Sequence, residues 1–453
     1  MTSSTAIAAW LDPTGCPAER PPRARMGEQT RTLHDSLDAY ARETGTAWLH
    51  PERPTIQRDL LGSPNVVAWQ EAKAAFLIRG DGGWSELPHL YARYGTPGTA
   101  RLIGALRELE GAGCAVVTDC GMQALALVAD TLLVRGAHAV VMRQIYNKTR
   151  TFLEWSARRV GATLTFVDDG DPAAVAAAIT PATQLVLAET FTNPLMRAQD
   201  IGALVAAAGR ARVVIDSTIA TPWAFRRPLL EQGVSIVTGS LTKALGGHDT
   251  ALGGYVATND AELANQLMDL LAMRGGILDD DRASRIATGL PAANRLHARR
   301  CASASAVATF LAKHPRIECV VHPSLPDHPD AEVIARDYTR HGSIVSFRVA
   351  GADEARHRHI ADVLVSCGVP RFALSFDGLA TKVNHHRTVS EYFTPADAVA
   401  RAGIDRLIRL GIGIEDPDDL VACLNWTVHH ESHVTTEALD AWRASRSVEL
   451  QLR

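Results

Sequence analysis

Short apolar runs alternate with longer helical patterns between about residues 98 and 260, and this alternation constrains the fold more than any other feature. The apolar runs cover residues 115–118, 138–142, 163–167, 185–188, 213–215, 234–238 and 253–257. Runs without polar alternation are typical of strands that are buried on both faces. Strands separated by helices are typical of parallel sheets covered by helices on both sides. We therefore expect an α/β fold with a mostly parallel, doubly wound sheet.

The sequence before and after this alternating region predicts further parts of the chain. Residues 1–85 are interrupted by seven prolines, and we expect them to form an N-terminal arm that packs on another body, such as a second subunit. Residues 86–300 would form a large domain, and residues 301–453 a smaller α+β domain with its clearest strand at 343–349. Residues 282–313 contain few helix breakers and are expected to form a long connecting helix.

Composition excludes several classes of protein. The 453 residues are 46% hydrophobic and 21% charged, which excludes a wholly disordered chain. The net charge of −4 gives no electrostatic reason to expect nucleic acid or an anionic membrane as partner. No run reaches the roughly 18 to 20 apolar residues of a membrane span. The seven cysteines are scattered and form no Cys-x-x-Cys pair, so we expect no disulfide framework and no metal site, and we expect a reducing cytoplasm.

Polar residues follow four of the expected strands, at the edge of the sheet where ligands of open α/β folds bind. Gly121 opens a helix after the first strand, where free backbone N–H groups can hold a phosphate. Glu189 and Asp216 each follow an apolar strand, and Lys243 follows another between hydroxyl-bearing neighbours. A phosphate cradle, two carboxylates and a lysine are the groups that pyridoxal-phosphate chemistry requires.

The order of these segments resembles the Cys/Met-metabolism family of pyridoxal-phosphate enzymes. That family includes cystathionine γ-synthase, cystathionine γ- and β-lyases, methionine γ-lyase and O-acetylhomoserine sulfhydrylase. The resemblance covers residues 85–425, and its most specific piece is Ser240-Leu241-Thr242-Lys243 followed by Gly247-His248-Asp249. It implies a fold-type I transferase with a seven-stranded-type sheet between helices, a smaller α+β C-terminal domain, and pyridoxal 5'-phosphate as cofactor.

The resemblance also assigns roles around the cofactor. Lys243 would be the Schiff-base lysine and the proton shuttle, and Asp216 the partner of the pyridine nitrogen. Thr218 would lie near the ring oxygen, Tyr146 would stack on the ring and help move protons, and Glu189 would be an acid near the cofactor. The residues that would form the phosphate cradle are Gly121, Met122, Ser240 and Thr242.

Further roles concern the substrate and a second subunit. Arg409 matches the arginine that clamps the substrate carboxylate, a task that suits its planar, bidentate guanidinium. Asn193 and Ser375 would assist it. Tyr91 and Arg93 match a Tyr-x-Arg pair that reaches the phosphate of the neighbouring subunit, which implies a homodimer or homotetramer with shared active sites.

Several positions depart from the family's usual pattern. Cys120 stands where the family usually has serine, and Tyr146 is followed by Asn147 and Lys148 in place of two small residues. Asp377 stands in a segment that is usually Leu-Gly-Gly. These changes leave the cofactor residues in place and alter the walls of the substrate pocket.

The expected reaction is γ-elimination or γ-replacement on a γ-substituted L-amino acid. Such a substrate would resemble homoserine, methionine or cystathionine, or would be a bulkier compound of specialised metabolism. A first alternative is β-elimination from a cystathionine- or cysteine-like substrate, which needs one deprotonation only. A second is a non-catalytic binding protein on the same scaffold, against which the intact Lys243 and Asp216 argue.

Overall fold

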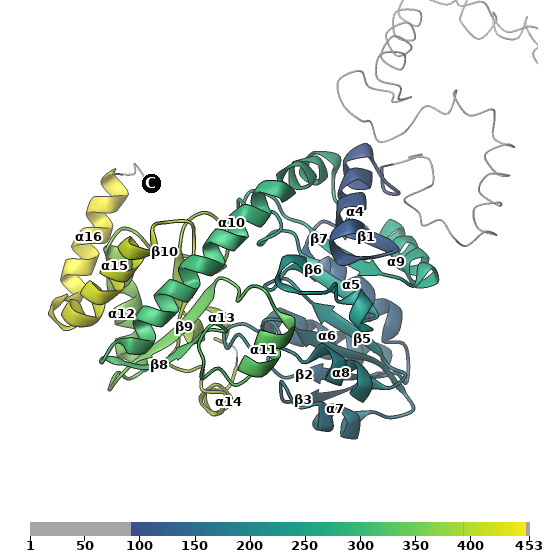
Figure 1. Cartoon of the computed structure of the whole chain (residues 1–453), viewed down its shortest axis with the longest axis horizontal. Helices are drawn as coiled ribbons and strands as arrows, with labels where there is room; N and C mark the ends of the chain where they lie inside the picture. The colour runs from purple at the N-terminus through teal and green to yellow at the C-terminus, as the bar shows by residue number, and fades with distance from the viewer. Residues whose placement is uncertain (1–91, 393, 450–453) are drawn as a thin grey trace, which may run out of the picture. The chain divides into compact units, whose positions relative to one another are not determined.

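The computed structural model describes residues 92–392 and 394–449, with side chains described up to residue 445 (Figure 1). The expected arm, residues 1–85, and Tyr91 lie outside the described residues. The chain divides into two units, Met1–Pro97 and Gly98–Arg453. Everything below on the sheets and the cavity concerns the second unit, in which the described residues include no helix long and apolar enough to cross a membrane.

The larger sheet has seven strands in the order β1-β7-β6-β5-β4-β2-β3. Its strands are β1 (Cys114–Thr118), β2 (His138–Met142), β3 (Thr163–Val167), β4 (Thr183–Glu189), β5 (Arg212–Asp216), β6 (Ile236–Ser240) and β7 (Gly254–Thr258). Only β7 runs antiparallel to its two neighbours within this sheet, β1 and β6. The other pairings are parallel, so the expected mostly parallel, seven-stranded sheet is confirmed.

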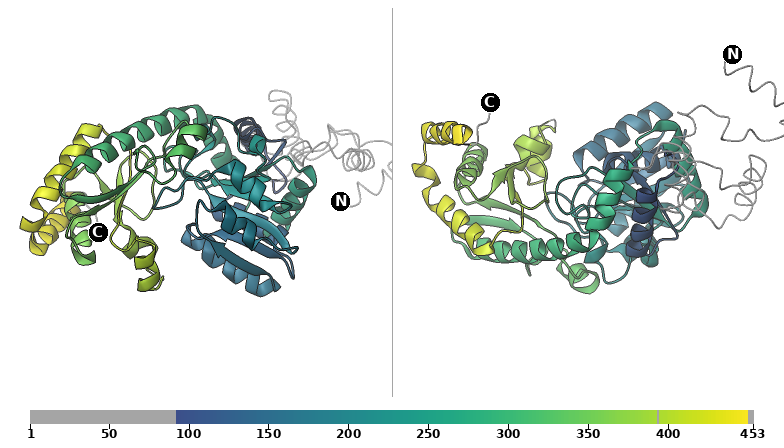
Figure 2. Two further views of the ribbon diagram at one scale, coloured as in Figure 1. Left: turned by 60° about the horizontal axis from the view of Figure 1, so that its bottom comes forward. Right: turned by 90° about the horizontal axis from the view of Figure 1, so that it is seen from above.

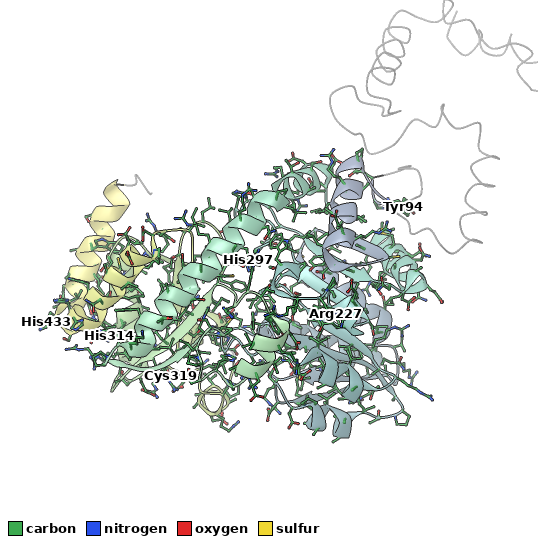
Figure 3. All side chains as sticks on the ribbon, in the orientation of Figure 1. Tyr94, Arg227, His297, His314, Cys319 and His433 are labelled. Atoms are coloured by element: carbon green, nitrogen blue, oxygen red, sulfur yellow. The ribbon has the colours of Figure 1, made fainter. Side chains whose placement is uncertain are left out.

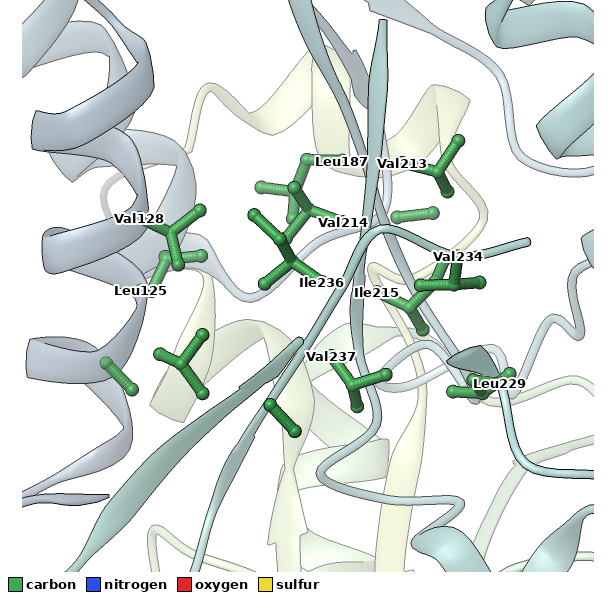
Figure 4. Close-up of a cluster of buried hydrophobic side chains, with 14 of the residues drawn as sticks. Leu125, Val128, Leu187, Val213, Val214, Ile215, Leu229, Val234, Ile236 and Val237 are labelled. Carbon is green, nitrogen blue, oxygen red and sulfur yellow. The ribbon is translucent and has the colours of Figure 1, made fainter. Parts of the chain in front are cut away.

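Helices flank this sheet, and their packing follows from the alternation of side chains along each buried strand. They are α4 (Pro97–Glu110), α5 (Gly121–Leu132), α6 (Asn147–Val160), α7 (Pro172–Ala178), α8 (Ile201–Ala208) and α9 (Ala261–Arg274), with short 3₁₀ turns at Pro222–Ala224 and Leu230–Gln232. Figure 4 shows Val214 of β5 on the side of α5, near Leu125 and Val128. Val213 and Ile215, one residue away on either side, point to the opposite face.

Helix α10 (Asp280–Lys313) connects the larger sheet to a smaller one (Figure 2). Asp279 begins the helix, because its side chain accepts a hydrogen bond from the backbone N–H of Arg282, and the helix continues for 34 residues. The sequence placed a connecting helix at 282–313, so its existence and its end agree with the structure. The expected domain boundary between residues 300 and 301 falls inside this helix.

The smaller sheet has the order β10-β11-β12-β9-β8 and its own apolar core. Its strands are β8 (Ile317–Val321), β9 (Ile344–Val349), β10 (Arg371–Phe372), β11 (Lys382–His385) and β12 (Ile408–Gly411). The helices of this half are α11 (Ala331–Asp337), α12 (Glu354–Ser366), α13 (His386–Ser390), α14 (Ala396–Arg401), α15 (Pro417–His430) and α16 (Thr436–Glu449), with a 3₁₀ turn at Glu431–His433. This α+β half is the second sheet domain that the sequence led us to expect.

Candidate active site

A cavity of about 450 Å³ lies at the carboxyl ends of the central parallel strands, where residues of the two sheets meet. The predicted site residues that line it are Gly121, Met122, Tyr146, Asn193, Asp216, Thr218, Ser240, Thr242, Lys243, Ser375 and Arg409. Tyr91 lies outside the described residues. Arg93 belongs to the preceding unit, in which its guanidinium lies 5.8 Å from the centre of the Tyr94 ring. Glu189, the expected acid near the cofactor, also lines the cavity, so the structure gathers twelve of the fourteen predicted residues around it.

The start of helix α5 forms one wall of this cavity. Cys120 precedes the helix without capping it through its side chain, although three other helices near the sheet begin with an aspartate cap. A Cβ atom at Gly121 would lie 2.8 Å from Cβ and 3.1 Å from Cα of Ser240, so only glycine fits there. An uncapped helix start beside the hydroxyl groups of Ser240 and Thr242 is a suitable site for an anion such as phosphate.

Two carboxyl groups, those of the buried Glu189 and the partly buried Asp216, stand side by side in the wall of the cavity. Glu189 ends β4 and Asp216 ends β5, and the two residues are paired in the register of these parallel strands. Burial raises the pKa of both, and the charge of Asp216 raises that of Glu189 further. Backbone N–H groups hold them in place: Thr218 donates to Asp216 Oδ1 (2.9 Å) and Tyr146 donates to Glu189 Oε1 (2.6 Å). A cationic group in the cavity would stabilise the ionised form of this pair.

Lys243 follows β6, and its ammonium group reaches across the cavity to residues that belong to the other half of the unit. Nζ contacts Ser375 Oγ and lies 5.0 Å from the centre of the Phe376 ring. Burial lowers the pKa of Lys243, while the nearby Asp377 carboxylate acts in the opposite direction. A lowered pKa increases the fraction of neutral amine, which is the form that acts as a nucleophile or a base.

Arg409 lies in the middle of β12 and is only 2% exposed. Its Nη1 donates to Asn193 Oδ1 (3.3 Å), and its Nη2 donates to the carbonyl oxygens of Leu374 (3.0 Å) and Ser375 (3.1 Å). Burial lowers its pKa to about 10, so the guanidinium remains charged at neutral pH. Its buried Nε has no hydrogen-bond partner among the described residues, which leaves a donor for an anionic ligand.

The mouth of the cavity contains residues that the sequence did not single out. Leu252, Leu374, Val389, Ser390 and Tyr392 all line it. The first two lie in loops, and the others belong to or follow the short helix α13, so neither a periodic pattern nor a motif marks them. The apolar side chains of Leu252, Leu374 and Val389 make this part of the wall suitable for an uncharged portion of a ligand.

Two departures from the family pattern also lie at the mouth. Tyr146 is 45% exposed, and Lys148 places its ammonium 5.8 Å from the centre of the Tyr392 ring. Asn147 contacts the carbonyl of Ser390 through its side-chain amide. The described residues include no group of three or more His, Cys, Asp or Glu that could hold a metal ion.

Comparison with known proteins gives a consistent result. Residues 72–428 match the model of a family described as Cys/Met metabolism PLP-dependent enzyme. L-methionine gamma-lyase of Fusobacterium nucleatum subsp. polymorphum is 31% identical over 377 residues, which are 81% of this chain and 94% of that protein. Cystathionine gamma-synthase 1, chloroplastic, of Arabidopsis thaliana is 32% identical over 337 residues, and the match covers 73% of this chain and 58% of the plant protein.

A solved structure shows the same likeness in three dimensions. Cystathionine gamma synthase from Xanthomonas oryzae pv. oryzae, in complex with aminoacrylate and cysteine, superposes with a TM-score of 0.72 at 31% identity. The match covers 76% of this chain and 89% of that chain.

The cavity fits pyridoxal 5'-phosphate on its own geometry. The glycine-lined start of α5 leaves room for an anion, and a Cβ at Gly121 would fill that space. The Glu189–Asp216 pair favours a cation, which a protonated pyridine ring provides. Lys243 supplies an amine of lowered pKa in the same cavity. These three observations match the phosphate, the ring nitrogen and the aldehyde of the cofactor.

Proposed function

Since the chain belongs to the Cys/Met-metabolism family of pyridoxal-phosphate-dependent enzymes, we propose that it catalyses γ-elimination or γ-replacement on a γ-substituted L-amino acid. The observation that carries this proposal is the convergence of Lys243 and Arg409 on Ser375. Lys243 Nζ contacts the hydroxyl of Ser375, and Arg409 donates to its carbonyl oxygen. An amino acid whose carboxylate is held by Arg409 would therefore have its α-carbon near the Lys243 amine.

The residues of the cavity divide the work between holding the cofactor and moving protons. Gly121, Ser240 and Thr242 would hold the phosphate, and Asp216 would keep the ring nitrogen protonated. When bound, pyridoxal phosphate supplies an electron sink that makes the α-proton of the substrate acidic. Lys243, as a partly buried amine of lowered pKa, would accept that proton, pass it on to the bound cofactor, and, once neutral again, accept a proton from the β-carbon.

Tyr146 and Arg409 complete the proposed assignment. The phenol of Tyr146 stands at the cavity mouth, where it would act on the departing γ-substituent. Burial and the nearby Glu189 raise the pKa of Tyr146, so its hydroxyl stays protonated and can donate. Arg409, with Asn193 and Ser375 around it, would orient the substrate carboxylate.

The substrate class that we propose is one resembling homoserine, methionine or cystathionine, or a bulkier γ-substituted amino acid. Leu252, Val389 and Tyr392 at the mouth would contact the γ-substituent, and Lys148 would lie next to it. After loss of this group, the unsaturated product either accepts a nucleophile or hydrolyses to a 2-oxo acid and ammonia.

A panel of γ- and β-substituted amino acids tests the proposal. Release of 2-oxo acid reports elimination, and mass spectrometry after addition of thiols reports replacement. The Lys243→Ala variant serves as the matched control for non-enzymatic breakdown. We expect turnover of γ-substituted substrates only with intact Lys243. Turnover of β-substituted substrates alone would assign the enzyme to β-elimination, and a protein that takes up no cofactor and turns over nothing would contradict the proposal.

We further propose that the enzyme is a cytoplasmic homodimer or homotetramer with shared active sites. The motive is the match of Tyr91 and Arg93 to a pair that, in the family, completes the phosphate site of the adjacent subunit. Neither Lys243→Ala nor Arg93→Ala protomers should be fully active alone. Mixing them should restore part of the activity, because some mixed sites contain both intact residues. An active monomer in light scattering, or no recovery despite demonstrated subunit exchange, would exclude the shared site.

A further inference from the structure

Arg300 is a charged residue in the wholly buried interior of the second unit. It lies on α10, one turn after His297, which Figure 3 labels near the middle of this helix. Its side chain is 0% exposed and is the largest fully buried one among the described residues. A buried guanidinium is costly unless other groups compensate its charge and accept its hydrogen bonds, so its surroundings call for an explanation.

The partners of Arg300 come from two loops. Its Nη1 donates to the carbonyl oxygens of Gly247 (3.2 Å) and Gly378 (2.8 Å). Its Nε lies 3.9 Å from Oδ1 of Asp377, which is 3% exposed. The hydroxyl of Ser343 donates to the same oxygen of Asp377 (2.8 Å). Arg300 and Asp377 thus form a buried ion pair, and Asp377 supplies the compensating charge.

These two loops carry the central groups of the cavity. The first, residues 243–247, is the lysine loop: its Gly247 N–H donates to the carbonyl oxygen of Lys243 (3.1 Å). The second, residues 374–378, is the clamp loop: two of its carbonyl oxygens accept from Arg409, and its Ser375 hydroxyl contacts Lys243. Arg300 therefore makes contact with both loops without itself lining the cavity.

The clamp loop has little freedom to move away from this arrangement. Asp377 has a positive φ of 60°, a conformation that side-chain-bearing residues rarely adopt. A Cβ atom at Gly411, two residues after Arg409, would lie 2.9 Å from Cβ of Phe376, so the loop lies directly on strand β12. The ion pair holds an aspartate in a backbone conformation that favours glycine, which is what a positioning role requires.

We propose that Arg300 and Asp377 are positioning residues that hold the lysine loop against the clamp loop and thereby fix the placement of Lys243 relative to Arg409. The inference rests on the proposed function, because it assigns a purpose to the spacing of these two groups. Neither Arg300 nor Asp377 lines the cavity, so both act through their neighbours.

Asp377 also places a negative charge near both cavity cations. Its carboxylate raises the pKa of Lys243 against the effect of burial, and it acts in the same direction on Arg409. The other charged groups that face Lys243 are Asp249 of the loop that follows it, Lys382 of β11 and Arg409 of β12. Neutralising Asp377 should therefore lower the pKa of Lys243, whereas a purely structural role would leave it unchanged.

Chemical labelling of the cofactor-free protein tests this effect without substrate or turnover. The extent to which acetic anhydride acetylates Lys243, measured by mass spectrometry of its peptide at several pH values, reports the pKa of that amine. We expect the labelling midpoint of Asp377→Asn to fall below that of wild type. The matched control is Asp330→Asn, which removes another ion pair of low exposure, with Arg197, away from the cavity. A midpoint unchanged in Asp377→Asn, or shifted equally in the control, would overturn the proposal.

Kinetics of the cofactor-loaded enzyme test the positioning role. Arg300→Met should lower kcat and raise KM together, with a loss in kcat/KM of about tenfold or more, because both loops are displaced. Arg300→Lys keeps a positive charge and should lose less kcat/KM than Arg300→Met. If Arg300→Met does not fold, the lysine variant is compared with wild type in its place. The Arg300→Met/Asp377→Asn double variant should lose less than the product of the single losses. Multiplicative losses would overturn the proposal. A shifted labelling midpoint in an enzyme without γ-chemistry would instead refute the proposed function alone.

Discussion

Glu110 offers a prediction whose sign and size both follow from the structure. It is the last residue of α4, is 1% exposed, and accepts a hydrogen bond from the Tyr255 hydroxyl at 2.5 Å. The Tyr255 ring packs against Gly239, where a Cβ atom would lie 2.7 Å from the ring, directly before Ser240 of the proposed phosphate cradle. Burial raises the pKa of Glu110 from 4.5 to about 7, and the hydrogen bond from Tyr255 opposes this rise.

The raised pKa determines how stability depends on pH. Below pH 4.5 the Glu110 carboxyl is protonated in both the folded and the unfolded protein, so its contribution to stability is fully present. As the pH rises through about 7, that contribution is lost, because the unfolded chain releases the proton more readily. A tenfold change in an ionisation constant is worth about 1.4 kcal/mol, so the total loss is about 3 kcal/mol, of which about 2.5 kcal/mol falls between pH 5 and pH 8.

The perturbation that isolates this effect is Glu110→Gln, which keeps an acceptor for the Tyr255 hydroxyl and removes the titration. Urea unfolding of the cofactor-free protein at pH 5 and pH 8 gives the stability of each variant. We expect the advantage of the glutamine variant over wild type to grow by about 2.5 kcal/mol between these two pH values. Other buried carboxyl groups, such as Asp169 with a pKa raised by burial to about 6, cancel in this difference.

A second variant tests the direction in which the Tyr255 hydrogen bond shifts the pKa of Glu110. Tyr255→Phe removes the hydrogen bond that lowers the pKa of Glu110, so wild-type Glu110 in that background should titrate at a higher pH. Parallel stability curves for wild type and Glu110→Gln would refute the reasoning, because they would mean that Glu110 ionises alike in the folded and unfolded protein.

Three further predictions concern the cavity itself. Gly121→Ala places a methyl group 2.8 Å from Cβ of Ser240 and should raise the Kd for pyridoxal phosphate about tenfold or more, measured by spectroscopic titration; an unchanged Kd would remove this helix start from the phosphate site. Asp216→Asn should retain the cofactor but slow turnover about 100-fold, and wild-type rates would show that Asp216 is not the ring partner. Arg409→Lys loses the two-pronged guanidinium and should lower kcat/KM about 10- to 100-fold, mainly through KM; a loss confined to kcat would contradict carboxylate binding.

The larger sheet could be predicted because each of its buried strands is an apolar run in the sequence. Residues 213–215 and 138–142 are buried on both faces of the sheet. Such an apolar run can be identified as a strand without knowing which strand pairs with it. The insertion of β7 between β1 and β6 was not predicted, because strand order depends on pairing between distant segments. Strand β11 was missed for a different reason: its sequence Lys-Val-Asn-His has neither an apolar run nor a clear alternation.

The candidate site also contains residues that the sequence could place and residues that depend on the tertiary structure. Lys243, Asp216 and Gly121 could be placed together because the carboxyl ends of parallel strands share one edge. Tyr392 could not, because its position depends on how the smaller half folds against this edge. Arg300 carried no sequence signal either. On a helix of mixed composition a charged residue is expected at the surface, and only the tertiary structure reveals that it is buried.

The cavity draws its two sets of groups from different sheets. Groups proposed to hold the cofactor, such as Gly121, Asp216 and Lys243, follow strands of the larger sheet, whereas Arg409 lies in β12 of the smaller one. Changes in the clamp loop can therefore reshape the substrate side of the cavity while the cofactor side is preserved. Asp377 is such a change, and its buried charge requires a buried cation to accompany it. The connecting helix α10 supplies that cation as Arg300, so a charge introduced into the clamp loop is compensated from the helix that joins the two sheets.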